Sequence, residues 1–199
     1  GMAVSWDPDK VKAAGRATSE EVSCTGVHWT FSPVLCIARD TRWGRVDETF
    51  GEDPMLIGEL ASAMVKGYQG GAKAGEALPK NAIGTPLVTP LRPALATCWP
   101  LYCGTFMLGY ESIEGVPVTF NKWLLTDKLR GAWQYNGTLI TDWDNVGRSV
   151  WEQHVKPDYV HAAADAVKAG NDLVMTTPQF YEGAIEAVKI SSCLSLCFL

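Results

Sequence analysis

The sequence lacks the residue patterns that hold metal ions in proteins. None of its cysteines forms a C-x-x-C pair, and none of its three histidines stands in an H-E-x-x-H or similar spacing. Zinc sites usually carry one of these signatures. We therefore expect no metal centre and no cofactor, and we expect the thiols to be structural or incidental. The six cysteines are Cys24, Cys36, Cys98, Cys103, Cys193 and Cys197.

The sequence also lacks an excess of positive charge and any long apolar run. It has 17 lysines and arginines against 22 aspartates and glutamates, which gives a net charge of −5. A nucleic-acid-binding protein usually carries a basic face, and a membrane-spanning helix needs about 20 apolar residues. The first ten residues, GMAVSWDPDK, do not show the basic and then apolar pattern of a signal peptide. We expect neither nucleic acid nor a membrane as a partner, and no leader.

What the sequence does contain is typical of a folded globular protein. Hydrophobic residues make up 47% and charged residues 20% of its 199 positions. A chain of this size can bury a core as one domain. It is nevertheless shorter than the roughly 250 residues of a complete (β/α)₈ barrel.

Several segments carry helix signals. Asp7-Pro8 and Asp53-Pro54 each combine an N-cap residue with a proline at the first helical position, and apolar residues recur at helical spacing after both pairs. Similar periodicity follows three further starts later in the chain. We expect helices over 8–25, 54–69, 121–133, 158–169 and 179–189.

Short apolar segments between these helices predict strands. The unbroken run VLCI at 34–37 is typical of a strand that is buried on both faces. We expect strands over 27–37, 105–110, 137–141 and 172–175, and a turn at Glu114-Gly115. Because strands alternate with helices, the sequence predicts an α/β fold with a mostly parallel sheet. The segment 71–104, with five prolines and no apolar period, is expected to be irregular and the least ordered internal part of the chain.

Polar side chains follow the ends of four predicted strands. Because the carboxyl ends of parallel strands meet at one edge, these side chains are expected to share one rim, where α/β barrels carry their active sites. The alternative is that loops are polar in any protein. The residues are Arg39, Asp40, Tyr110, Asp142, Trp143, Asp144 and Thr176.

The most informative local pattern is Thr141-Asp142-Trp143-Asp144, directly after an apolar strand. Glycosidases combine a carboxylate that attacks or stabilises the anomeric carbon with an aromatic face that stacks on the sugar. The D-x-D pair could equally be a metal pair, and Asp144 is more readily explained as a helix cap for the turn at Asn145.

A second pattern is the arginine-rich loop 38–45, ARDTRWGR. Planar guanidinium groups suit bidentate contacts to carboxylates or to neighbouring hydroxyls. The alternative for each arginine is a structural ion pair with the acidic residues that follow. These acidic residues are Asp47, Glu48, Glu52 and Asp53.

With these patterns in place, the sequence resembles a known family. Residues 26–70, which include RWGRVDETFGEDP, and residues 109–146, which end in NGTLITDWDNV, resemble the first domain of family 3 glycoside hydrolases, the group of β-glucosidases and β-xylosidases. Residues 172–189 continue the resemblance. It implies a (β/α)₈ TIM-barrel-like fold, here truncated or with missing strands.

The resemblance also implies roles for four residues. Asp142 matches the catalytic nucleophile, and Trp143 matches the neighbour that lines the glycone subsite. Arg45 matches the arginine that binds sugar hydroxyls, and Tyr110 matches the tyrosine near the nucleophile. The implied activity is retaining hydrolysis of a terminal β-linked glucose or xylose, with a β-glucoside or β-xyloside as the substrate. Retention requires a second carboxyl group about 5–5.5 Å from the first.

The sequence departs from the family in three places. The family's Lys-His motif is absent, the segment 71–104 stands in its place as an insert, and the tail 191–199 is unrelated to the family. We therefore expect residues 1–190 to be a partial barrel domain. The family's upstream aspartate and its acid/base glutamate fall outside this sequence, so we expect impaired hydrolysis. The alternatives are a non-catalytic sugar-binding remnant and a non-functional fragment.

Overall fold

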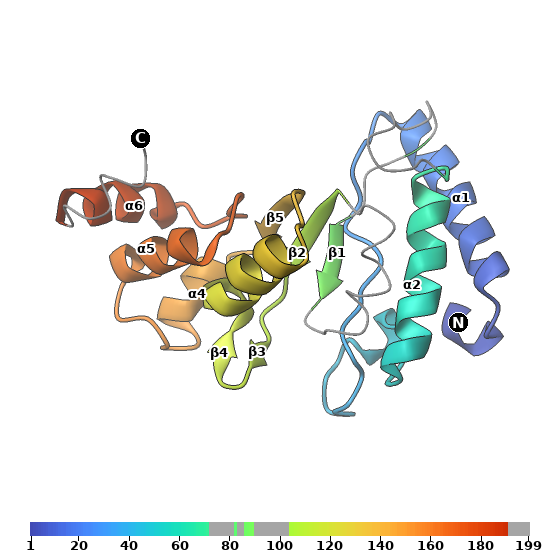
Figure 1. The fold of residues 1–199 in the computed structure, drawn as a ribbon, viewed down its shortest axis with the longest axis horizontal. Coiled ribbons are helices and arrows are strands. Elements are labelled where there is room, and N and C mark those ends of the chain that lie inside the picture. The colour runs from blue at the N-terminus through green and yellow to red at the C-terminus, as the bar shows by residue number, and fades with distance from the viewer. Residues whose placement is uncertain (72–81, 83–85, 90–103, 191–199) are drawn as a thin grey trace. The chain divides into compact units, whose positions relative to one another are not determined.

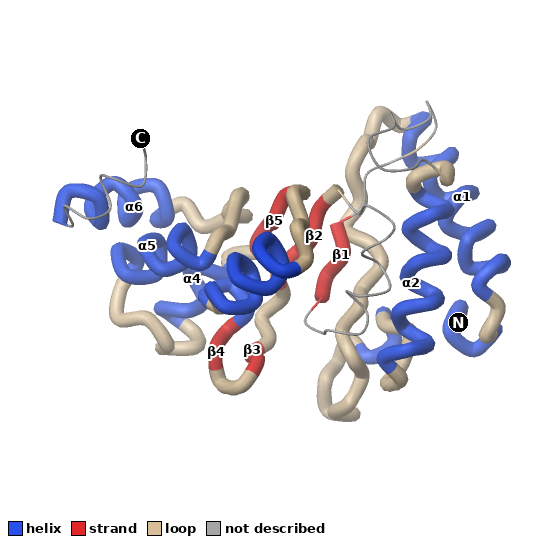
Figure 2. The backbone as a smooth tube through the Cα atoms, in the orientation of Figure 1, coloured by secondary structure: helices blue, strands red, loops and turns tan. Residues whose placement is uncertain are grey.

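The computed structural model describes residues 1–71, 82, 86–89 and 104–190 (Figure 1). The chain divides into two compact units, Gly1–Met107 and Leu108–Leu199, and each is treated by itself below. Figure 2 shows that helices and loops account for most of the described backbone, with short strands between them.

The first unit is built on two helices whose starts match the sequence signals. The carboxylate of Asp7 accepts hydrogen bonds from two backbone amides at the start of one helix, and that of Asp53 does the same for the other. Both predicted helices, 8–25 and 54–69, are confirmed to within one residue. The helical elements are η1 (Met2–Ser5), α1 (Pro8–Cys24), η2 (Val46–Glu48) and α2 (Pro54–Tyr68).

Helices α1 and α2 lie side by side and approach closely at two glycines (Figure 1). A Cβ atom on Gly15 would stand 2.8 Å from the backbone oxygen of Met64, and a Cβ on Gly67 would collide with the backbone oxygen of Lys12. The Ser19 hydroxyl adds a buried hydrogen bond of 2.9 Å to a backbone oxygen of α2. The apolar stripe of α2 therefore packs against α1 with backbone almost touching backbone.

The strand predicted over 27–37 does not form. Leu35 and Cys36 are buried as the sequence indicated, yet only isolated bridge residues occur in this segment, at Trp29 and Val34. Pro33 gives the physical reason, because it has no N–H to donate to a strand ladder. Continuous apolar character predicted the burial correctly and the strand wrongly.

Most of the segment 71–104 lies outside the described residues, and so does the tail 191–199. Strand β1 (Pro86–Thr89) is described within that segment, so the segment includes regular structure. Strand β2 (Thr105–Leu108) follows at the boundary of the two units and confirms most of the strand predicted over 105–110.

The second unit follows the predicted order with two additions. The turn at Glu114-Gly115 joins a two-stranded antiparallel hairpin, and both of its residues have positive φ angles, 52° and 81°, as tight hairpin turns require. Helix α4, directly after the turn at Asp144, was not predicted. The elements are β3 (Ser112–Ile113), β4 (Val116–Pro117), η4 (Val118–Phe120), η5 (Trp123–Ala132), β5 (Thr138–Thr141), α4 (Asn145–Trp151), α5 (Tyr159–Ala169) and α6 (Gln179–Ile190).

Two of these helices show how local signals set their ends. The side chain of Asn121 accepts a hydrogen bond of 3.0 Å from Leu124 N at the start of η5, which is a π-helix and not the expected α-helix. Asp158 caps α5 by accepting from His161 N, and Gly170, with φ 103°, ends it. Helices α4, α5 and α6 then pack on a small core. That core contains Val146, Ala162 and Ala166, with Phe120, Val150, Val174 and Phe180 against them.

The strand predicted over 172–175 is reduced to one parallel bridge, Ile140 to Leu173. Backbone hydrogen bonds from Thr141 N to Leu173 O and from Asp144 N to Met175 O, both 3.0 Å long, join the two segments, and side chains add to them. The Asp172 carboxylate accepts from Leu139 N at 2.7 Å, and the Thr141 hydroxyl oxygen accepts from Met175 N at 2.9 Å. The described residues thus form mixed α/β units with parallel pairing at β5, and they do not show a complete (β/α)₈ barrel. None of their helices has the length and apolar character that crossing a bilayer would need.

The glycine contact between α1 and α2 makes a direct prediction. Gly67→Ala should destabilise the protein by about 1–3 kcal/mol, because the added methyl group must push the two backbones apart. Lys66→Ala, at the neighbouring exposed position of α2, should leave stability nearly unchanged. Chemical denaturation followed by circular dichroism measures both. Equal midpoints for the two variants would show that the helices are not packed this closely.

Candidate functional site

Asp142 stands directly after β5, and its backbone is fixed on both sides. Its N–H donates to the backbone oxygen of Leu108 at 3.0 Å, and its own backbone oxygen accepts from Asn145 N at 3.1 Å. The half-buried carboxylate accepts a hydrogen bond of 2.6 Å from Trp143 N through Oδ1. Asp142 is in none of the other side-chain hydrogen bonds or ion pairs of the described residues, so Oδ2 is the oxygen that remains available.

Tyr110 and Trp143 lie next to Asp142. The Tyr110 hydroxyl, just beyond the end of β2, donates to the backbone oxygen of Trp143 at 2.7 Å. The Trp143 side chain is 60% exposed, so the indole is open to a binding partner. The structure therefore brings three of the residues singled out in the sequence to the end of β5.

Arg45 belongs to the other unit, where it pairs with a carboxylate. Its guanidinium donates twice to Glu48, from Nε and Nη2, at 2.7 Å each. The same type of contact joins Arg42 to Asp40 at 2.6 Å. These arginines hold the pKa of Glu48 and that of Asp40 below their usual values. Arg45 thus has an ion-pair partner of the kind that the alternative interpretation named, whereas Arg42 pairs with the preceding Asp40. The sugar-binding role of Arg45 remains a prediction.

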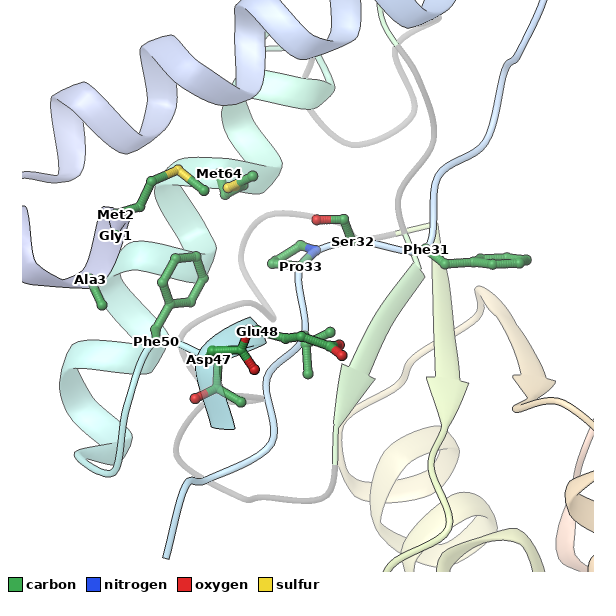
Figure 3. Close-up of a pocket in the computed structure, with 12 residues that line it drawn as sticks. Gly1, Met2, Ala3, Phe31, Ser32, Pro33, Asp47, Glu48, Phe50 and Met64 are labelled. Carbon is green, nitrogen blue, oxygen red and sulfur yellow. The ribbon is translucent and has the colours of Figure 1, made fainter. Parts of the chain in front are cut away.

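A pocket of about 270 Å³ lies in the first unit beside this ion pair. Figure 3 shows Asp47 and Glu48 of η2, Met64 of α2 and Met2 of η1 around it. Its walls are both acidic and apolar, and Glu48 links it to Arg45, which does not itself line the pocket.

Asp144 occupies the position before α4, but its side chain does not cap that helix. Its backbone is left-handed, with φ 49°, and its carboxylate makes no capping hydrogen bond. Instead Oδ2 accepts from Trp151 Nε1 and Oδ1 accepts from the Thr177 hydroxyl, both at 2.9 Å. The capping role expected for the side chain is therefore wrong.

Across the described ranges, no group of three His, Cys, Asp or Glu residues is arranged to hold a metal ion.

Two residues of α4 that the sequence did not single out complete the site. Asn145 is 3% exposed, and its side-chain nitrogen lies within 3.0 Å of the backbone oxygens of Leu108 and Gly109 and of the Thr119 hydroxyl. Arg148 lies over the Tyr110 ring, 5.0 Å from its centre. Neither residue has a period or motif that marks it. The one available signal was that both follow closely on the Asp142 turn.

Comparison with known proteins gives the family. The model of the glycosyl hydrolase family 3 N-terminal domain matches residues 1–80 and 102–194. This match covers well over half of the chain. The α/β units with a polar strand end thus belong to a glycoside hydrolase domain, and the chain is a member of glycosyl hydrolase family 3.

Individual relatives agree with this assignment. A lysosomal β-glucosidase of Dictyostelium discoideum is 29% identical over 202 residues, which are 88% of this chain and 25% of that protein. A solved β-glucosidase involved in saponin metabolism from intestinal bacteria is 78% identical with a TM-score of 0.88, over 95% of this chain and 28% of that one. The β-glucosidase of Listeria innocua, solved with glucose, is 31% identical with a TM-score of 0.82, over 97% and 30%. The chain thus spans about a quarter of the length of these proteins.

Asn145 allows a test of the site's framework. Asn145→Ala should lower the free energy of unfolding by about 1–3 kcal/mol, because it removes the donor from three buried acceptors at once. Asn136→Ala, at an exposed position before β5, is the matched control and should have little effect. Urea unfolding followed by tryptophan fluorescence compares them. If Asn145→Ala is as stable as the control, the buried hydrogen bonds do not hold the end of β5.

Proposed function

We propose that this chain carries the nucleophile of a retaining β-glucosidase or β-xylosidase, and that the nucleophile is Asp142. The observation that supports this most directly is its position, since it follows β5 in a chain of glycosyl hydrolase family 3. Its relatives include β-glucosidases and a β-xylosidase. The substrates would be β-linked glucosides or xylosides.

The geometry around Asp142 suits attack on an anomeric carbon. The Trp143 amide holds Oδ1 and so fixes the plane of the carboxylate, which leaves Oδ2 to form the bond to the sugar. In a retaining enzyme the resulting covalent glycosyl intermediate is then hydrolysed by water, with help from a second carboxyl group about 5–5.5 Å away. The exposed indole of Trp143 offers an apolar face to the sugar ring.

Tyr110 and Arg45 are proposed to bind sugar hydroxyls. The Tyr110 hydroxyl donates to Trp143 O next to Asp142, and a phenolic oxygen is a group that also binds sugar hydroxyls. Glu48 orients the Arg45 guanidinium through Nε and Nη2, and a guanidinium is a donor of the kind that binds sugar oxygens. We further propose that residues 1–190 form a partial barrel domain with an insert at 71–104, which the gap at 81–101 in the family match supports.

Covalent trapping tests the role of Asp142. Dinitrophenyl 2-deoxy-2-fluoro-β-glucoside carries a leaving group that needs no protonation, so it should glycosylate the carboxylate and leave it trapped. Mass spectrometry of peptides should place the label on Asp142. Asp142→Asn should abolish labelling and reduce turnover of dinitrophenyl β-glucoside by roughly 10⁴-fold or more.

The control for trapping is Asp127→Asn, which alters an exposed aspartate on η5. It should be labelled as the wild type is. A label on any carboxylate other than Asp142 would contradict the proposal, as would reversible binding of glucose without any labelling. The latter result would instead support a non-catalytic sugar-binding domain.

The substrate class can be narrowed further. The 78% identity to a β-glucosidase involved in saponin metabolism supports glucosylated saponins as substrates, whose aglycones are large and apolar. The exposed Trp143 and Trp151 offer apolar surface close to Asp142 for such a group. We expect a glucosylated saponin to slow covalent trapping at Asp142 at a lower concentration than laminaribiose or the matched xyloside does. Equal protection by the saponin and laminaribiose would contradict this.

A further inference from the structure

Arg148 has an unusual environment on α4. Its guanidinium carbon lies 5.0 Å from the centre of the Tyr110 ring and 5.5 Å from that of the Trp151 ring. Nη1 pairs with Glu152 at 2.8 Å, whereas Nε is buried and has no hydrogen-bond partner among the described residues. An unpaired buried donor is unfavourable, so hydrogen bonding alone does not explain where this side chain lies. The two aromatic faces, which attract a cation, do explain it.

Both aromatic residues that contact Arg148 also donate hydrogen bonds to the turn that carries Asp142. Tyr110 donates from its hydroxyl to Trp143 O at 2.7 Å, and Trp151 donates from Nε1 to Asp144 Oδ2 at 2.9 Å. Trp143 and Asp144 are neighbours in the chain, so the contacts form a closed path that begins and ends at Arg148. We call these five residues, Tyr110, Trp143, Asp144, Arg148 and Trp151, the positioning ring.

We propose that Arg148 is a positioning residue for the nucleophile. In contact with both aromatic rings, it fixes Tyr110, which holds the backbone oxygen of Trp143, and Trp151, which holds the carboxylate of Asp144. The N–H of Trp143 then orients Oδ1 of Asp142. This proposal rests on the proposed role of Asp142, and it gives Arg148 no contact with the substrate. Its effect is on the angle at which Asp142 meets the anomeric carbon.

The first measurement is hydrogen exchange, which needs no activity. In the wild type the amides of Asp142 and Asp144 donate to the backbone oxygens of Leu108 and Met175. Arg148→Met keeps a long apolar side chain but removes the cation, so exchange at 142–144 should become faster while α5 stays protected. Glu152→Gln is the matched control, because it removes the ion pair of Arg148 and leaves the stacking on both rings.

The second measurement is the rate of covalent trapping at Asp142. Arg148→Met should slow labelling by up to roughly 10²-fold, as expected for a misplaced reacting group, with little change in the concentration of fluoroglucoside that half-saturates it. Arg148→Lys keeps a cation over the rings and should recover part of the rate. Tyr110→Phe removes the hydroxyl that links the positioning ring to Trp143 O. In the Tyr110→Phe background, Arg148→Met should therefore slow labelling much less than it does in the wild type.

The two measurements separate this proposal from the proposed function. If the wild type is not labelled at Asp142, the nucleophile assignment fails, and hydrogen exchange still decides whether Arg148 holds the turn. If Arg148→Met exchanges and reacts as the wild type does, the positioning role is wrong. If hydrogen exchange in α5 also becomes faster in Arg148→Met, the test is made with Trp151→Phe. This variant keeps an aromatic side chain beside Arg148 and loses only the N–H that donates to Asp144. Unchanged exchange at Asp144 in Trp151→Phe would then overturn the proposal.

Discussion

The hydrogen bond from Asp142 N to the backbone oxygen of Leu108 is the constraint on which the candidate site depends. It ties the first residue after β5 to the last residue of β2, and so places the turn of residues 142–144 beside the segment that carries Tyr110. Asn145 strengthens the same junction, because its buried side chain reaches the backbone oxygens of Leu108 and Gly109. Without this junction the Tyr110 hydroxyl would have no fixed relation to Trp143.

Polar side chains reinforce the pairing of β5 with residues 172–175. Among the described residues one parallel bridge joins the two segments, and the Asp172 carboxylate and the Thr141 hydroxyl supply hydrogen bonds in addition to those of the backbone. Asp144 adds a third link through Thr177. Hydrogen-bond networks of this kind favour one geometry when every member is satisfied. The end of β5 is therefore set by specific side chains on both flanks.

The sequence predicted those parts of the fold that depend on local signals. Asp7, Asp53 and Asp158 cap helices because their carboxylates reach amides two or three residues ahead, which is a property of the local chain. The strands predicted over 27–37 and 172–175 failed because ladder formation depends on partners distant in sequence and on donors such as the one Pro33 lacks. Burial followed the apolar run at Leu35 and Cys36, whereas Leu173 in the second run is 45% exposed.

The site was predictable to a similar degree. Asp142 and Trp143 stood out because a carboxylate and an indole follow an apolar strand, and the family motif drew attention to Tyr110. Arg148 and Asn145 were not predicted as site residues, because their roles arise from contacts with residues 26 to 38 positions away in the chain. No period or local motif encodes such contacts.

The D-x-D pattern left open a metal pair and a helix cap at Asp144, and the two carboxylates have different surroundings in the structure. Both oxygens of Asp144 accept hydrogen bonds, one from Trp151 and one from Thr177. Each of these donors withdraws electron density and blocks approach, so Asp144 is suited to a structural role. Asp142 accepts one hydrogen bond, through Oδ1, which orients the group and leaves Oδ2 without a partner among the described residues. A nucleophile must be held without being fully satisfied, so this difference supports the proposal that Asp142 is the nucleophile.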